Sequence, residues 1–333
     1  MTSPLLALPE KTLYEKRSLI KEKQTPKIYN FPARIDTNNF DIFILGKFLY
    51  WQPIGDFLDV AFVKTAPYVN YPHHKKTYQM NFSYKPAFKI GLGATFSKMD
   101  DWEIFMEYLW FHPTNKSSYT LPESHTHVYR MCSIILGPIS QTTAKWTLDM
   151  DMLDLLLSRS YYMGKKIVLL PHVGVKGGWI DQKYYQTSTA YDTIDDVDYH
   201  PIFYDKTTCW NIGPRMGLNG MWKLGNGFSF LSKSAVSLLF SNYRLKRKIN
   251  QIYYSGEYSD LLTTKHDFHL SPVGETVFGF GWGAFIGKKQ CHIDFSFTYE
   301  FQIWSKQEIY LVGNYIWGNL TMQGLTLSSQ IDF

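Results

Sequence analysis

The amino-acid sequence predicts an all-β fold, a closed antiparallel transmembrane β-barrel, and three observations support this prediction. Apolar and polar residues alternate along unusually long stretches, short and long polar connectors follow one another in turn, and aromatic residues make up 17% of the 333 residues. Charged residues reach only 19%, below the roughly 25% of ordinary soluble chains. No stretch offers the about 20 consecutive apolar residues that a membrane-spanning helix needs. The chain therefore has to place a large aromatic surface away from water without using helices.

The N-terminal segment differs from the rest of the chain. Residues 1–9 are apolar but short and lack the basic residue of an export signal, so no signal peptide is visible in the chain as given. Residues 10–27 are densely charged. We therefore expect residues 1–39 to be an exposed charged segment and residues 40–333 to form the barrel.

The clearest alternation runs from Gln290 to Ile303. Seven apolar residues, starting at Cys291, share one face, and seven polar residues, starting at Gln290, share the other, because alternate side chains of a strand point to opposite sides. Strands of soluble domains usually have about 5–6 residues, whereas a transmembrane strand needs about 9–11. A soluble sandwich is the competing interpretation, but it does not need strands this long with so many rings on one face.

The same period of two defines the other strands, and the connectors set their number. Short connectors at 98–101, 161–166, 225–227 and 287–290 alternate with long polar stretches at about 52–83, 112–142, 183–206 and 244–270. Bacterial barrels have short periplasmic turns, long outer loops and an even number of strands. The sequence therefore predicts ten strands, at 40–51, 84–97, 102–111, 143–160, 167–182, 207–224, 228–243, 271–286, 290–303 and 318–333.

Two further stretches, 57–65 and 309–317, also resemble strands. If either belonged to an additional membrane hairpin, the barrel would have twelve strands. We expect them to be hairpins within outer loops.

Aromatic residues on the lipid-facing side indicate where the bilayer would lie. Trp102 and Trp110 are eight positions apart on one face, which corresponds to roughly 20 Å of height at ~3.3 Å per residue and a tilt of ~40°. That height approximates the apolar band of an outer-membrane barrel. We expect an aromatic girdle that includes Trp102, Trp110, Trp282 and Phe333. A last strand that ends in an aromatic residue is also typical of barrels handled by the barrel-assembly machinery, so we expect that machinery as a partner through Phe333.

Charged residues of the strands are expected to point inward, because Lys or Arg facing lipid near the midplane costs about 2–4 kcal/mol. Acidic residues outnumber Lys and Arg in this set, so any conducting path would lean towards cations. Asp154 shares the phase of Met150 and Met152 and would turn inward only through a bulge after Met152. The predicted pore-lining residues are Lys89, Glu103, Glu107, Asp149, Asp151, His172, Lys176, Arg215, Glu275, Asp294 and Glu300.

Motifs for other chemistry are sparse. His125 and His127 could share a face, but no Cys, Asp or Glu lies at ligand spacing. Walker A, G-x-S-x-G and H-E-x-x-H sequences are missing from the chain. We predict no metal site, no cofactor and no enzymatic activity, although Ser, His and Asp on several strands leave a barrel-embedded hydrolase open. One outer loop gathers four aspartates whose spacing does not match a calcium loop, so a solvated acidic loop is favoured, with Asp192, Asp195, Asp196 and Asp198.

The charge balance argues against nucleic acid as a partner, because the formal net charge is only +5. Two local basic runs, at 73–76 and 244–248, lie in turn-like contexts. Solvated loops are the favoured interpretation of both runs. The alternative is contact with anionic lipid head groups at a membrane surface.

Over nearly the whole chain, the sequence resembles the pore-forming outer-membrane proteins similar to the Legionella and chlamydial major outer membrane proteins. Three cysteines are fewer than in the cysteine-rich chlamydial members, so a disulfide-linked envelope is not implied. The resemblance rests on the order and spacing of segments at 48–51, 88–93, 101–102, 107–111, 152–155, 170–174, 178–182, 212–217 with Trp222, and 238–240.

The resemblance implies a multi-pass barrel of the bacterial outer membrane that acts as a porin, through which small hydrophilic solutes or ions diffuse passively. Lipid and lipopolysaccharide of that membrane are the expected partners, and assembly into a homo-oligomer stays open. Ten strands leave a narrow interior, because side chains fill small barrels. The main alternative is therefore a closed structural or adhesive barrel that acts through its outer loops.

Overall fold

The computed structural model describes nine parts of the chain. The expected N-terminal segment, His125 of the histidine pair, and Asp195 and Asp196 of the acidic loop lie outside these parts. Among the described residues, no helix is long and apolar enough to cross a membrane. The described parts are 41–63, 76–96, 101–121, 126–128, 139–192, 197–252, 258–286, 291–312 and 314–333.

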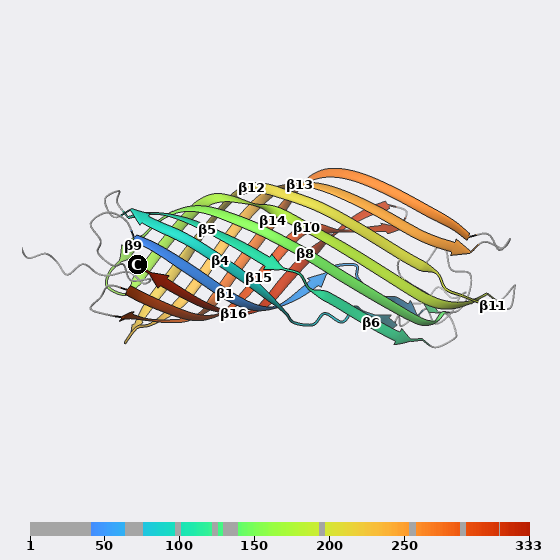
Figure 1. The fold of residues 1–333 in the computed structure, drawn as a ribbon, viewed down its shortest axis with the longest axis horizontal. Helices are drawn as coiled ribbons and strands as arrows, with labels where there is room; N and C mark the ends of the chain where they lie inside the picture. Colours follow the sequence, from blue (N-terminus) through green and yellow to red (C-terminus); the bar gives the residue numbers. More distant parts are fainter. Residues whose placement is uncertain are drawn as a thin grey trace, which may run out of the picture.

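Ten antiparallel strands close into a barrel (Figure 1). Each strand pairs with the next along the chain, and the last pairs back onto the first through thirteen register positions. Strands paired on both sides around the ring meet the condition for a sheet in hydrocarbon, although residues 258–272 of β14 pair with β13 alone. The strands are β1 (Asp41–Gly55), β4 (Lys85–Phe96), β5 (Trp102–Phe111), β8 (Ile139–Arg159), β10 (Ile167–Asp192), β12 (Ile202–Gly225), β13 (Phe228–Ile252), β14 (Tyr258–Ile286), β15 (Cys291–Val312) and β16 (Asn314–Asp332).

The prediction of ten strands is confirmed, and the two extra strand-like stretches add none to the ring. Residues 309–317 continue the hairpin of β15 and β16. Part of 57–65 forms β2 (Ala61–Val63), which pairs with β3 (Lys76–Tyr78) and β7 (Thr126–Val128) in a separate small sheet. The remaining short strands, β6 (Thr114–Thr120), β9 (Tyr161–Met163) and β11 (Val197–Tyr199), pair with β8 or β10 at the ends of the barrel.

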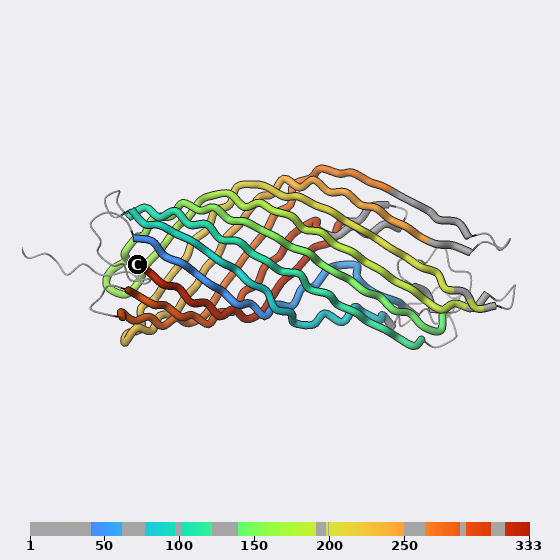
Figure 2. Tube along the Cα trace, in the orientation of Figure 1, coloured from blue at the N-terminus to red at the C-terminus, as the bar shows by residue number. Residues whose placement is uncertain are grey.

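Several strands are much longer than a bilayer requires. β10, β12, β13 and β14 have 26, 24, 25 and 29 residues, against about 9–11 for one crossing. Most of the stretches expected to be loops at 183–206 and 244–270 is therefore strand. The start of β1 and the C-terminus lie together at the end of the barrel that is opposite to these added strand residues (Figure 2). We name that end the turn end, and it also holds the tight turn around Asn226. The outer surface next to the turn end is apolar, and we name it the apolar band. We name the part of the barrel beyond the apolar band the extension.

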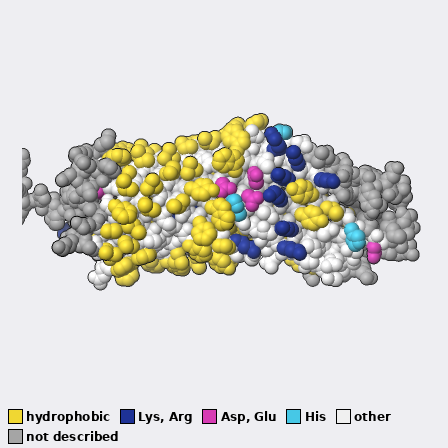
Figure 3. Space-filling view, in the orientation of Figure 1, with side chains coloured by type: hydrophobic (Ala, Val, Ile, Leu, Met, Phe, Trp, Pro, Cys, Tyr) yellow, Lys and Arg dark blue, Asp and Glu magenta, His cyan; other side chains and the backbone are white. Residues whose placement is uncertain are grey.

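The barrel surface changes character along its length. Near the turn end the outward side chains are mostly large and apolar, such as Ile90, Met106 and Phe280, with 44–62% of their surface exposed. In the extension most outward side chains are polar, and the buried inward ones include large apolar residues, such as Trp146 and Ile249, beside polar ones, such as Gln186 and Arg247. Figure 3 shows this boundary as an edge between hydrophobic side chains and a group of Lys and Arg side chains.

Candidate functional site in the barrel interior

A layer of charged side chains crosses the middle of the barrel interior. Nine of the ten strands each contribute one member, with β16 as the exception. The members hold five basic and four acidic groups. We name this set the charged layer: Lys47, Lys89, Glu107, Asp154, Lys176, Arg215, Lys233, Glu275 and Glu300.

One half of the charged layer is organised around Glu107 and Lys89. Lys47 Nζ lies 2.5 Å from Glu107 Oε2, and Lys89 Nζ lies 3.7 Å from Glu107 Oε1. Lys89 also donates to Glu300 Oε2 at 3.0 Å, although β4 and β15 are not neighbours in the sheet. These side chains therefore reach across the interior and tie non-adjacent strands together.

The other half of the charged layer is organised around Glu275. Arg215 binds this carboxylate with both terminal nitrogens, the second at 2.9 Å, and Lys176 Nζ lies 3.2 Å from it. Lys176 also pairs with Asp154 at 3.0 Å. These four side chains are at most 11% exposed. Removing one partner from such a buried network leaves an uncompensated charge, which costs about 3–5 kcal/mol.

An apolar cluster closes the interior on the extension side of the charged layer. All ten strands contribute to it, and so do Leu58, Val60 and Met80 from the chain between β1 and β4. The two layers are in contact, because Lys89 Nζ lies 4.8 Å from the centre of the Trp51 ring and Lys176 Nζ lies 5.2 Å from that of Trp304. Such cation–π contacts gain strength where water is excluded. Both tryptophans are fully buried.

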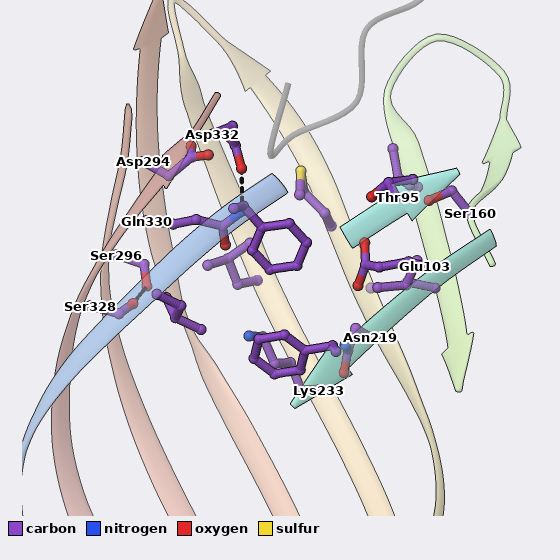
Figure 4. Close-up of a pocket in the computed structure, with 18 of the residues that line it drawn as sticks. Thr95, Glu103, Ser160, Asn219, Lys233, Asp294, Ser296, Ser328, Gln330 and Asp332 are labelled. Atoms are coloured by element: carbon purple, nitrogen blue, oxygen red, sulfur yellow. Dashed lines mark hydrogen bonds between the residues drawn. The ribbon is translucent and has the colours of Figure 1, made fainter. Parts of the chain in front are cut away.

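Two cavities lie on the turn side of the apolar cluster. One of about 100 Å³ lies within the charged layer, and one of about 180 Å³ lies towards the turn end. Lys47, Lys233, Ser296 and Ser328 line both. Figure 4 shows the larger cavity, with Asp294, Ser296, Ser328 and Gln330 on one wall and Thr95, Glu103 and Ser160 on the other.

A buried histidine and two carboxylates form a separate cluster near this cavity. His292 Nδ1 lies 3.0 Å from Asp294 Oδ2 and 3.3 Å from Asp332 Oδ2. The three ligand atoms lie within 4.8 Å of one another and could hold a metal ion. The imidazole is already engaged by both carboxylates, so an ion pair accounts for the arrangement. No local pattern indicates this cluster, because Asp332 is 38 positions from Asp294 along the chain.

The structure places the predicted pore-lining residues in the charged layer, beside the two cavities, in the His292 cluster or on the outer surface. Lys89, Glu107, Lys176, Arg215, Glu275 and Glu300 belong to the charged layer. His172 lines the cavity of about 100 Å³ within the charged layer, Glu103 lines the larger cavity, and Asp294 belongs to the His292 cluster. Asp149 and Asp151 lie on the outer surface. Lys47, Asp154 and Lys233 are interior charges that the sequence-based set lacks.

The inward placement of Asp149 and Asp151 is therefore wrong. Asp151 accepts a hydrogen bond from Tyr108 Oη at 2.5 Å on the exposed face, and Asp149 pairs with exposed Lys183 at 3.4 Å. The alternation of β8 is regular from Thr142 to Ser158, so Asp154 turns inward without a bulge after Met152. Met150 and Met152, which lie on the same face of β8 as Asp154, belong to the apolar cluster inside the barrel and do not face lipid.

The predicted girdle residues lie on the outside of the barrel. Trp102, Trp110 and Trp282 have 38–39% of their surface exposed, and Phe333 has 55%. The two tryptophans of β5 face outward at its two ends. Trp102 and Phe333 lie towards the turn end, and Trp110 precedes the polar surface of the extension.

Comparisons with solved structures give likenesses of low similarity. The outer membrane protease OmpT from Escherichia coli is 9% identical, with a TM-score of 0.44 over 90% of this chain and 99% of that chain. The toluene transporter TodX of P. putida is 6% identical, with a TM-score of 0.25 over 89% and 90% of the two chains. A Pseudomonas aeruginosa FadL homologue is 7% identical, with a TM-score of 0.23 over 89% and 90%. These TM-scores carry no argument about function.

The family comparison is decisive where the structural likenesses are not. No curated protein matches the chain. The sequence model of one family, described as Legionella pneumophila major outer membrane protein precursor, matches residues 35–333. This match covers the whole barrel and agrees with its apolar outer band and closed sheet. The chain therefore belongs to the Legionella major outer membrane protein family and is a β-barrel of the outer membrane.

Proposed function

We propose that this protein is a closed outer-membrane barrel, which anchors a long extracellular β-extension and blocks solute diffusion in its resting structure. Bacterial barrels turn their termini and short connections to the periplasm, so the turn end is periplasmic in this proposal. The extension then projects from the cell surface. Its function would be structural or adhesive and would depend on that projecting surface.

The observation that carries this proposal is the apolar cluster. Ten strands and the chain between β1 and β4 supply its buried side chains. A path for hydrophilic solutes needs a polar lining with room for water. Trp51, Phe111, Trp146 and Trp304 are at most 1% exposed. Ions would have to cross this packed layer, in which buried polar side chains such as Gln182 and Gln307 are already hydrogen-bonded within the protein.

Conductance in a planar lipid bilayer tests the proposal. The wild-type protein should show no stepwise current, whereas Trp51→Ala combined with Trp304→Ala should conduct, because it removes the two rings next to the charged layer. Trp179→Ala, which removes an outward ring that is 65% exposed, is the matched control and should stay silent. Folding of each variant is checked by heat-modifiable migration on gels. Steady stepwise current through the wild-type protein would contradict the closed barrel.

Porin-like passive diffusion is the second candidate, and the cavities on the periplasmic side, which charged and polar side chains line in part, favour it. They reach from the turn end to the charged layer and would form half of a channel. If the wild-type protein conducts, reversal potentials in a salt gradient show its selectivity. A path that leans towards cations should lose this preference when Asp294→Asn and Glu300→Gln are combined, because rings of carboxylates attract cations.

A further inference from the structure

Basic side chains gather on the outer surface just beyond the apolar band. They project from β6, β8, β10, β12 and β13, and Figure 3 shows Lys and Arg side chains beside the edge of the hydrophobic surface. Alternation along each strand gives them the same outward direction as the exposed apolar residues of the band. We name this set the basic belt: Lys116, Lys145, Lys183, Lys206, Arg244, Lys246 and Lys248.

The strand register places lysines of the basic belt directly opposite one another. Lys183 pairs with Lys206 across β10 and β12, and Lys206 pairs with Lys246 across β12 and β13. Directly opposite side chains have Cβ atoms about 4.5–5.5 Å apart, and like charges at that distance destabilise a sheet. Lys116 and Lys145 form a second such pair across β6 and β8. The sheet thus holds rows of like charge together at a cost.

The described carboxylates neutralise these rows only in part. Asp149 pairs with Lys183 at 3.4 Å, and Asp181, two positions before Lys183 on the same face, interacts electrostatically with Lys183 and Lys206. Within the described ranges neither Lys206 nor Lys246 has a carboxylate at ion-pair distance, so three adjacent lysines share two nearby carboxylates. An external anion with several charged oxygens would turn this repulsion into attraction, because each ammonium group can donate to it.

The height of the basic belt identifies the class of anion. On β10, Lys183 follows the exposed Trp179 by four residues, and on β12, Lys206 precedes the exposed Trp210 by four. Four residues of a tilted strand rise roughly 10 Å. The belt therefore lies at head-group level when the tryptophans lie at the edge of the hydrocarbon. Basic clusters at that level attract anionic lipid head groups.

The neighbouring side chains favour a glycolipid over a simple phospholipid. Tyr185 and Tyr204 are directly opposite each other, two positions beyond the lysine row. They point outward, and Tyr185 is 39% exposed. Their hydroxyls can exchange hydrogen bonds with sugar hydroxyls, and their rings offer an apolar face. A lipid that carries both sugar and phosphate groups matches this combination of lysines and tyrosines.

We propose that Lys183, Lys206 and Lys246 bind the phosphate groups of a phosphorylated glycolipid, the lipid A part of lipopolysaccharide, in the outer leaflet. The proposal depends on the extension facing outward, but it does not depend on whether the barrel conducts. Binding is measured on detergent-solubilised full-length protein, so its failure is distinguishable from failure of the closed barrel.

The test compares charge-neutral variants at the two ends of the barrel. Lys206→Gln combined with Lys246→Gln removes two members of the row, whereas Lys165→Gln combined with Lys166→Gln makes the same change in an exposed turn at the turn end. The probes are diphosphorylated lipid A, its dephosphorylated form and phosphatidylglycerol, each titrated and counted by native mass spectrometry. Heat-modifiable migration confirms that both variants fold.

The wild-type protein and the turn-end variant should bind diphosphorylated lipid A equally, and the belt variant should bind it about tenfold more weakly. Dephosphorylated lipid A should bind the wild-type protein as weakly as the belt variant binds the intact lipid. Equal binding of diphosphorylated lipid A by the wild-type protein and the belt variant would overturn the site. Phosphatidylglycerol binding as tightly as lipid A would overturn the choice of a glycolipid.

Discussion

At the scale of single residues, the carboxylate of Glu275 holds together one half of the charged layer. Arg215 and Lys176 both pair with it, and its side chain is 9% exposed. Glu275→Gln keeps the shape but leaves two buried cations without their shared anion, which should lower the free energy of unfolding by about 3–5 kcal/mol. Urea unfolding of the protein refolded into lipid vesicles measures this loss.

The exposed pair of Asp149 and Lys183 provides the control for that measurement. Its side chains are 33% and 46% exposed, and exposed pairs contribute only about 0.2–1 kcal/mol because water and salt screen them. Asp149→Asn should therefore move the unfolding midpoint little. Equal effects of Glu275→Gln and Asp149→Asn would show that the interior is as well solvated as the surface.

The candidate site illustrates which residues can be placed from a sequence. Lys89 and Glu300 lie on strands where one face is wholly apolar and exposed, so alternation alone directs them inward. On β8 the same argument fails, because Met150 and Met152 face an apolar cluster inside the barrel. A lipid-facing surface and a packed protein core both favour apolar side chains. A period of two therefore separates the two faces of a strand but does not tell which one faces out.

At the scale of whole elements, β14 depends on glycine for its contact with β15. A Cβ atom at Gly279 would lie 2.2 Å from the carbonyl oxygen of Phe297 and 2.5 Å from Cα of Thr298. Both are backbone atoms of the neighbouring strand, so the strands would have to move apart. Overpacking of this kind costs about 1–3 kcal/mol. Gly279→Ala should therefore lower both the refolding yield and the urea midpoint.

Gly46 of β1 provides the matched control for this substitution. A Cβ atom there would meet nothing within 4 Å, so Gly46→Ala should refold as well as the wild-type protein. The heat-modifiable band after refolding gives the yield for both variants. A loss of yield that is the same for Gly46→Ala and Gly279→Ala would indicate that backbone flexibility, not strand contact, sets the requirement.

The length of the strands could not be predicted from the same pattern that located them. In the extension, Arg244, Lys246 and Lys248 point outward while Leu245 points inward, and this alternation resembles a charge run in a loop. Arg247 also points inward, where it binds Asp205 with bonds of 2.7 and 2.6 Å. The ion pair places a charged residue on the inward face of β13. The alternation of apolar and polar residues therefore breaks at Arg247, and the sequence predicts a strand that ends too early.

At the scale of the whole molecule, connector lengths were enough to predict a ring of ten strands, because short and long connectors must alternate in an up-and-down barrel. The side chains that fill the interior of that ring were not predictable. Leu58, Val60 and Met80 lie in chain segments without long strands, yet they are buried among residues of all ten strands. Nothing in the local sequence distinguishes such a segment from a solvated outer loop.

The position of the bilayer on the barrel can be tested with one substitution in the apolar band. Met106 faces outward, is 44% exposed and lies four residues from both Trp102 and Trp110. If these tryptophans mark the two edges of the hydrocarbon, Met106 lies near its midplane. Met106→Arg should then cost about 2–4 kcal/mol and reduce the assembled fraction in the outer membrane.

Thr147 provides the comparison at the level of the basic belt. It faces outward and lies directly opposite both Thr114 and Lys183, so Thr147→Arg should cost only about 0–1 kcal/mol because an interfacial Arg stays hydrated. Urea midpoints in vesicles and the folded fraction in isolated outer membranes give both values. Equal tolerance of the two arginines would mean that water, and not lipid, surrounds Met106. The exposed rings of the barrel would then have to be covered by another protein surface.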